Sequence, residues 1–64
     1  MSHPTTLDLV RSLTFDQYVE FVNIAFVEYF DRMPNGDVKS GVRFWYDINV
    51  HPISAALMLP DWGY

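Results

Sequence analysis

Apolar residues recur every three or four positions through the middle of the chain, between Phe15 and Met33. That spacing places them on one side of an α-helix and continues for roughly five turns. Thr14, just before this segment, and Gln17, three residues later, have the spacing of a capping box, in which each side chain accepts a hydrogen bond from the other's backbone amide. The pattern predicts a long amphipathic helix over about residues 14–32. Its core face would contain Phe15, Tyr18, Val19, Val22, Phe26, Tyr29, Phe30 and Met33.

Residues 40–50 fit two patterns. Apolar or aromatic residues at every second position, from Val42 to Val50, are typical of a strand. As a helix, the same segment would place Arg43 and Asp47 four residues apart, where they can pair. A lone strand would leave its backbone groups without partners, because the chain has no second clear strand pattern. We therefore favour a helix over residues 40–50, with Ser40 as its cap.

The last predicted element begins at Pro52, since proline suits the first position of a helix. The run that follows is rich in alanine and leucine, which favour helix formation. A short apolar stripe would contain Ile53, Ala56 and Leu57, with Leu59 as a further candidate. A short helix is expected over residues 52–59, and Pro60 is expected to end it.

Together these segments predict a small all-α domain that spans residues 1–64, with one long helix and two shorter helical segments. An α+β fold, with residues 42–50 as a strand, is the alternative. Residues 1–4 precede the periodic segments and are expected to be flexible.

Composition limits the class of protein. A chain of 64 residues is close to the smallest size that folds unaided, so one domain is expected. Half of the residues are hydrophobic and 17% are aromatic, which is too apolar for a disordered chain. The absence of cysteine excludes a disulfide framework and a thiolate zinc site.

Charge limits the partners. Eight acidic residues against four basic ones give a net charge of −4. Nucleic acids and anionic membrane surfaces attract clustered lysine and arginine, so neither is an expected partner. No apolar run approaches the roughly 18–20 residues of a membrane span, and the start of the chain lacks the features of a leader peptide. We expect a soluble, cytoplasmic protein.

Candidate catalytic residues are few. His3 and His51 are the only side chains with an ordinary pKa near neutrality. His3 lies in the end that is expected to be flexible, and His51 precedes a proline, where a capping or turn role is expected. Spacings typical of metal sites and glycine-rich phosphate loops are absent from the sequence. We expect no enzymatic activity, no cofactor and no metal.

The outer side of the long helix is unusual, because Phe21 and Ile24 are interleaved there with Glu20 and Glu28. Large apolar side chains on such a face indicate that something covers them. One hypothesis is that the C-terminal segment folds over them. A second is a docking face with an apolar centre and an acidic rim, suited to a basic partner protein. A homodimer face is the third.

Aromatic residues add further candidates. Trp45 is expected in the core, whereas Trp62 and Tyr64 follow a proline near the end of the chain. Tryptophan and tyrosine are enriched among residues that dominate binding energies. The candidate partner-binding residues are Glu20, Phe21, Ile24, Glu28, Asp31, Asp61, Trp62 and Tyr64.

The segments LTFDQYVEFV and SGVRFWYDIN, with the small size, acidity and lack of cysteine, carry a resemblance to a known class. The chain resembles the short acidic proteins, encoded by bacteriophages and mobile elements, that bind and inhibit host proteins, anti-CRISPR proteins among them. The resemblance covers most of the chain and assigns no function to single residues. It implies stoichiometric binding to a basic surface of a larger protein in the host cytoplasm.

Two functions remain open. The first is a small acidic protein-binding module that inhibits a host defence protein by occupying its basic surface. The alternative is a small structural subunit or homo-oligomer whose apolar face is covered by its own copies.

Overall fold

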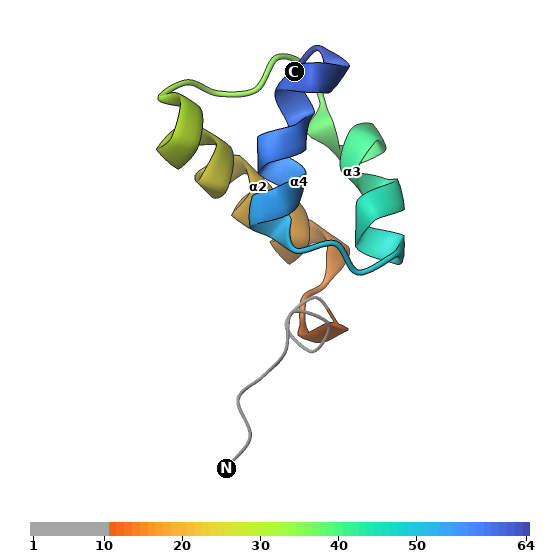
Figure 1. Ribbon diagram of the computed structural model, residues 1–64. Helices are drawn as coiled ribbons and strands as arrows, with labels where there is room; N and C mark the ends of the chain where they lie inside the picture. The colour runs from red at the N-terminus through yellow and green to blue at the C-terminus, as the bar shows by residue number, and fades with distance from the viewer. Residues whose placement is uncertain (1–10) are drawn as a thin grey trace.

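The computed structural model describes residues 11–64, so the expectation for residues 1–4 lies outside the described part of the chain. Four helical elements lie wholly within this part: α2 (Phe15–Phe30), α3 (Val38–Asp47), α4 (Pro52–Met58) and the 3-10 helix η1 (Leu59–Trp62). Residues 11–64 contain no strand. The all-α prediction is confirmed, and the strand alternative for residues 42–50 is wrong. In Figure 1, α4 lies between α2 and α3, and the C-terminal end returns to the loop that follows α2.

The predicted capping box begins α2. The Thr14 hydroxyl accepts from the Gln17 amide at 3.1 Å, and the Gln17 side chain accepts from the Thr14 amide at 2.9 Å. These two bonds satisfy backbone donors that an isolated helix start leaves open. The helix ends at Asp31, which has a left-handed φ of 54° and donates its amide proton to the Val27 carbonyl. It is slightly shorter than the predicted 14–32 because Asp31 already leaves helical geometry.

Helix α3 spans Val38–Asp47, so it both begins and ends earlier than the predicted segment 40–50. Asp37, not Ser40, is the N-cap, and its carboxylate accepts from the Lys39 amide at 2.9 Å. Aspartate is a strong N-cap because its side-chain oxygen replaces the missing intrahelical acceptor. The earlier start adds Val38 to the helix, and its side chain is buried in the core.

The third helix, α4, begins at Pro52 as predicted. His51 is its N-cap, because the imidazole Nδ1 accepts from the Ile53 amide at 3.1 Å. The expected capping role of His51 is therefore confirmed. The observed range Pro52–Met58 is one residue shorter than the predicted 52–59.

Pro60 does not end the helical segment, which corrects the prediction. The chain tightens after α4 into η1, and Pro60 lies within the first turn of this 3-10 helix. A proline is tolerated there because the first turn of a helix leaves amide donors unused in any case. The segment ends at Gly63, whose φ of 91° is a conformation that glycine adopts without strain.

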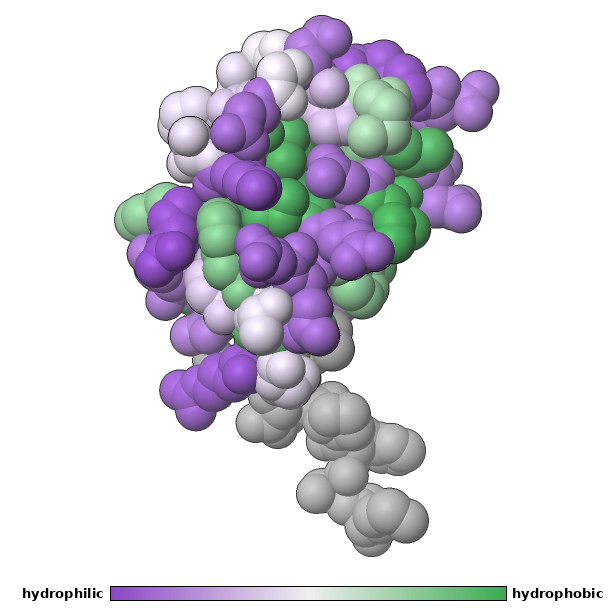
Figure 2. Space-filling model, turned by 180° about the vertical axis from the view of Figure 1, so that it is seen from behind, coloured by the Kyte–Doolittle hydropathy of each residue, from purple (hydrophilic) through white to green (hydrophobic). Residues whose placement is uncertain are grey.

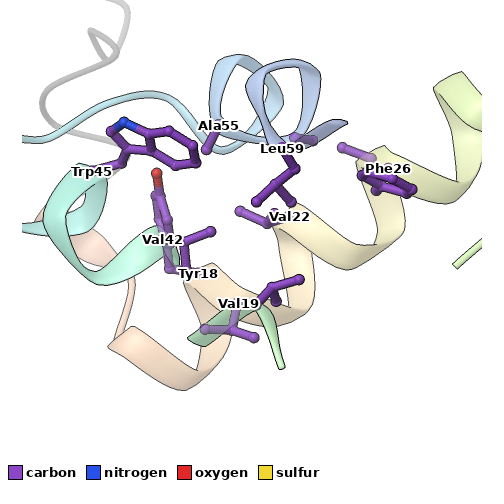
Figure 3. Packing of buried hydrophobic residues seen from close by; sticks show 11 residues of the cluster. Tyr18, Val19, Val22, Phe26, Val42, Trp45, Ala55 and Leu59 are labelled. Atoms are coloured by element: carbon purple, nitrogen blue, oxygen red, sulfur yellow. The ribbon is translucent and has the colours of Figure 1, made fainter. Parts of the chain in front are cut away.

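The core lies between the inner side of α2 and the elements α3, α4 and η1. Ala55 and Ala56 of α4 are fully buried, and their small side chains allow α4 to approach α2 closely. Trp45 of α3 is also buried, as predicted. Figure 3 shows this cluster, with labels on Tyr18, Val19, Val22, Phe26, Val42, Trp45, Ala55 and Leu59.

Tyr18 ties α2 to the segment that joins α3 and α4. Its hydroxyl donates to the Val50 carbonyl at 2.8 Å. Burial raises the pKa of Tyr18 to about 12, because a phenolate would lose its hydration there. The Tyr46 ring lies edge-on to Tyr18 at 5.2 Å between centroids, and the Tyr46 hydroxyl donates to the Leu13 carbonyl at 2.7 Å. These contacts hold the start of α2 against the end of α3.

The apolar stripe of α2 is longer than the core that covers it. Val22 and Phe26 are fully buried, as predicted. Tyr29 and Met33, which the sequence also predicted in the core, are 57% and 61% exposed. The reason is that α4 has only seven residues and continues into η1, where Trp62 packs toward α3 and not along the end of α2.

Candidate protein-binding surface

The outer side of α2 is not covered by the C-terminal segment. Ile24 is 59% exposed, and the half-buried Phe21 lies edge-on to the His51 ring at 6.2 Å between centroids. Trp62 and Tyr64 contact α3 instead. The hypothesis that the tail folds over Phe21 and Ile24 is therefore wrong. We use the name "outer face of α2" for the surface formed by Glu20, Phe21, Ile24, Val27 and Glu28.

Two open hollows lie on this face. The larger, of about 450 Å³, lies where α2 meets α4. The smaller, of about 280 Å³, lies on the side of Ile24 and Glu28 that faces away from α4, and it reaches Met33 in the loop that follows α2. The larger hollow is lined by Phe21, Ile24, Ala25, Glu28, Tyr29 and Ile53. The smaller is lined by Asn23, Ile24, Val27, Glu28 and Met33.

Ile24 and Glu28 line both hollows, so they form the wall between them. The lining is mostly apolar, and its polar groups are the Glu28 carboxylate, the Asn23 amide and the Tyr29 hydroxyl. Figure 2 shows the side of the molecule turned away in Figure 1, where hydrophobic patches reach the surface between hydrophilic side chains. This mixture of apolar hollows with a polar surround is typical of a protein-binding surface.

Both charged side chains of the outer face are carboxylates. Glu20 and Glu28 are exposed, and neither α2 nor α4 contains a lysine or an arginine. The nearest base along the chain is Arg32, just after α2. Its guanidinium donates to the main-chain oxygens of Tyr64 at 2.8 Å and Met33 at 3.2 Å and stacks over the Phe26 ring. Arg32 is thus engaged with the loop and the tail. The carboxylates of the outer face have no basic neighbour on their own helix, because α2 contains no lysine or arginine.

Asp31 lies beyond this surface. It is the C-cap of α2, is exposed and lines neither hollow. Its left-handed conformation turns the chain out of the helix. Of the sequence candidates on α2, the structure therefore brings together Glu20, Phe21, Ile24 and Glu28, and leaves Asp31 at the end of the helix.

The three candidates at the C-terminal end belong to another part of the molecule. Trp62 is 71% exposed, and its ring lies edge-on to Trp45 of α3 at 6.3 Å between centroids. The Tyr64 ring lies over Gly41 of α3, and the main-chain oxygen of Tyr64 accepts from the Asn35 amide at 2.9 Å. Asp61 is exposed on η1.

A third hollow, of about 250 Å³, lies at this α3–η1 surface. Phe44 is 66% exposed there beside Trp62. Ser40, Gly41 and Trp45 complete its lining. Apart from Asp31, the candidate residues thus divide into two groups, one on the outer face of α2 and one at the C-terminal end, where η1 packs on α3.

The sequence did not single out several residues that line the hollows. Tyr29 and Met33 were assigned to the core, because their spacing continues the apolar stripe of α2. Ile53 comes from α4, and a contact between distant segments leaves no periodic signal. Phe44 was hidden by the two possible patterns of residues 40–50, since a strand and a helix would expose different side chains.

Groups that could bind metal are not assembled in residues 11–64, where no three His, Asp or Glu side chains come together. His51 uses its Nδ1 as a helix cap. In the same part of the chain, no helix combines the length and the hydrophobicity needed to cross a membrane.

Comparisons of the chain with protein-family models, with curated proteins and with solved structures give no match.

Proposed function

We propose that the protein is a small acidic binding module that docks the outer face of α2 on a basic surface of a larger protein. The observation that carries the proposal is Ile24, which is 59% exposed between Glu20 and Glu28 on a helix without lysine or arginine. An exposed apolar centre supplies binding energy once water is excluded. The surrounding carboxylates steer the encounter with a basic partner and disfavour acidic ones.

The proposed mode of action is stoichiometric occlusion. The bound protein would cover the basic surface of its partner and prevent another acidic ligand from occupying it. We assign no catalytic residue, cofactor or metal to the protein. The resemblance to short acidic phage-encoded inhibitors extends the proposal to a host defence protein as partner, with the host cytoplasm as the place of action.

Affinity capture with a pair of matched variants tests the proposal. Glu28→Lys and Asp61→Lys change the net charge equally, and both residues are exposed, but only Glu28 belongs to the outer face of α2. We expect Glu28→Lys to lose a partner that the unmodified protein retains, and Asp61→Lys to keep it. The purified partner should bind in a one-to-one complex and lose its own activity in proportion to the protein added. Equal weakening by both variants would show a general charge effect and would overturn the proposal.

The α3–η1 surface favours the alternative of a small homo-oligomer, because Phe44 and Trp62 are exposed there beside a hollow. Light scattering distinguishes the two functions. A monomer in the absence of a partner agrees with the binding module. A dimer that resists dilution and salt, and that Phe44→Ala dissociates, would favour the structural subunit.

A further inference from the structure

One row of side chains organises the outer face of α2. Residues four apart on an α-helix are neighbours and form a ridge along its surface. Glu20, Ile24 and Glu28 form such a ridge, and all three are exposed. The ridge therefore presents an acidic, an apolar and again an acidic side chain in succession.

The two hollows are the grooves on either side of this ridge. The next row on one side contains Phe21, Ala25 and Tyr29, which line the larger hollow together with Ile53 of α4. The next row on the other side contains Asn23 and Val27, which line the smaller hollow. Ala25 deepens the larger groove, because its side chain ends at Cβ.

We infer that this ridge and its grooves receive one basic amphipathic helix of the partner, which crosses α2 at about 50°. The inference rests on the proposed function and names the kind of segment that the outer face binds. Ridges formed by residues four apart fit into the corresponding grooves of a second helix at that angle. Apolar side chains of the partner helix enter both hollows, and its lysines or arginines lie beside Glu20 and Glu28.

A helix fits this surface better than an extended peptide. An extended segment binds by adding a strand to an open sheet edge, and residues 11–64 contain no strand to offer one. Against the apolar lining of the hollows, an extended backbone would leave its amides and carbonyls without partners. A helix satisfies these groups internally, so only its side chains need to fit the grooves.

Charge argues against a second copy of this chain as the occupant. In a symmetric dimer the same surface meets itself. Glu20 and Glu28 would then face the carboxylates of the other copy across an apolar contact, where like charges repel most strongly. A basic helix relieves the same two carboxylates, because its charges have the opposite sign.

Synthetic peptides test the inference on the full chain. The first probe is a fluorescein-labelled peptide of leucine, lysine and alanine, with its leucines at helical spacing on one side. The second exchanges one central alanine for proline, which breaks the helix and preserves the charge and the leucines. Fluorescence anisotropy measures the dissociation constant of each peptide for the protein and its variants.

We expect the helical peptide to bind, and the proline peptide to bind at least about tenfold more weakly. Ile24→Ala and Glu28→Lys should each weaken binding of the helical peptide by about tenfold, since they remove the apolar centre and reverse a rim charge. Phe44→Ala and Asp61→Lys, exposed on the other surface, should change it by less than about twofold.

Three results would overturn the inference. If both peptides bind equally well and Ile24→Ala and Glu28→Lys still weaken binding, the partner segment need not be helical. The inference of a helix would then be wrong, and the proposed function would still hold. If Phe44→Ala or Asp61→Lys abolishes binding and the α2 variants bind normally, both the helix inference and the proposed function would be wrong. A dimer of the protein that Ile24→Ala dissociates would assign the ridge to a second copy.

Discussion

The inner and outer sides of α2 both carry large apolar side chains, but they meet different surroundings. On the inner side, Val22 and Phe26 are fully buried against α3, α4 and η1. On the outer side, Ile24 is 59% exposed and Val27 is exposed as well. The described elements can cover only one side of the helix, because α3 and α4 are short and lie on the same side of it.

The difference separates residues that stabilise the fold from residues that are available for binding. Removing apolar side chains from water stabilises the chain only where other side chains cover them. A side chain left exposed adds little to stability and remains free to contact another molecule. Substitutions on the two sides of α2 should therefore have effects of different size and kind.

Phe26→Ala should cause the largest effect. Truncating a fully buried phenylalanine costs about 3–5 kcal/mol of unfolding free energy, and a domain of this size holds about 3–5 kcal/mol in total. The substitution also removes the ring that lies 4.9 Å from the Arg32 guanidinium and 4.7 Å from the Phe30 ring. Circular dichroism should show a chain that is largely unfolded at room temperature. A cooperative melt close to that of the unmodified protein would show that the inner side is not the core.

Alkaline pH should lower the free energy of unfolding, because the buried Tyr18 on the inner side of α2 resists ionisation. The pKa of Tyr18 is raised from 10.0 to about 12 in the folded protein, so between these values the unfolded chain loses this proton and the folded chain retains it. The contribution of the protonated Tyr18 to folding stability is fully present below pH 10 and is lost as the pH rises toward 12. The free energy of unfolding should fall by about 2–3 kcal/mol across this range.

Denaturant titrations across this pH range measure the loss. Tyr18→Phe should be less stable at neutral pH by about 1 kcal/mol, because the Val50 carbonyl loses its donor. Its stability should then fall less steeply above pH 10. Parallel profiles for the two proteins would contradict the role of Tyr18 burial.

Tyr64→Ala should have a smaller effect that is confined to the α3 side. The half-buried ring packs on Gly41, so its loss should cost on the order of 1 kcal/mol. Amide chemical shifts should change at Gly41 and Asn35 and remain unchanged at Phe21 and Ile24. Shifts concentrated at Phe21 and Ile24 would mean that the tail covers the outer face after all.

Ile24→Ala should have the smallest effect on stability. An exposed substitution on a helix usually changes the free energy of unfolding by less than about 0.5 kcal/mol, and alanine is itself a good helix former. A thermal melt of this variant beside that of Phe26→Ala compares the two sides of one helix directly. Strong destabilisation by Ile24→Ala would place this residue in the core.

The fold could be predicted where local chemistry decides it. The capping box at Thr14 and the period of three and four fixed the start and the inner side of α2. The ambiguity of residues 40–50 is resolved by the Asp37 cap and by the contacts of Val42 and Trp45 with the core. The length of the core could not be predicted from the period, because the exposure of Tyr29 depends on where α4 ends.

The candidate site could be predicted in part. Ile24 and Phe21 stood out because they interrupt an acidic helix face. Their separation from Trp62 and Tyr64 depends on the path of η1 across α3, which is a long-range contact without a sequence pattern. The place of Ile53 in the lining of the larger hollow could not be predicted either, because it also depends on a long-range contact, between α4 and α2.

Photocross-linking inside cells is the most direct measurement of whether the outer face of α2 holds a partner. A photoreactive amino acid replaces Ile24 in one variant and the similarly exposed Phe44 in another. We expect position 24 to cross-link to a single protein, position 44 not to do so, and the product at position 24 to disappear when Glu20 and Glu28 are both changed to lysine. Cross-linking of that protein at position 44 alone, or a product at position 24 that persists after both charge reversals, would contradict the account.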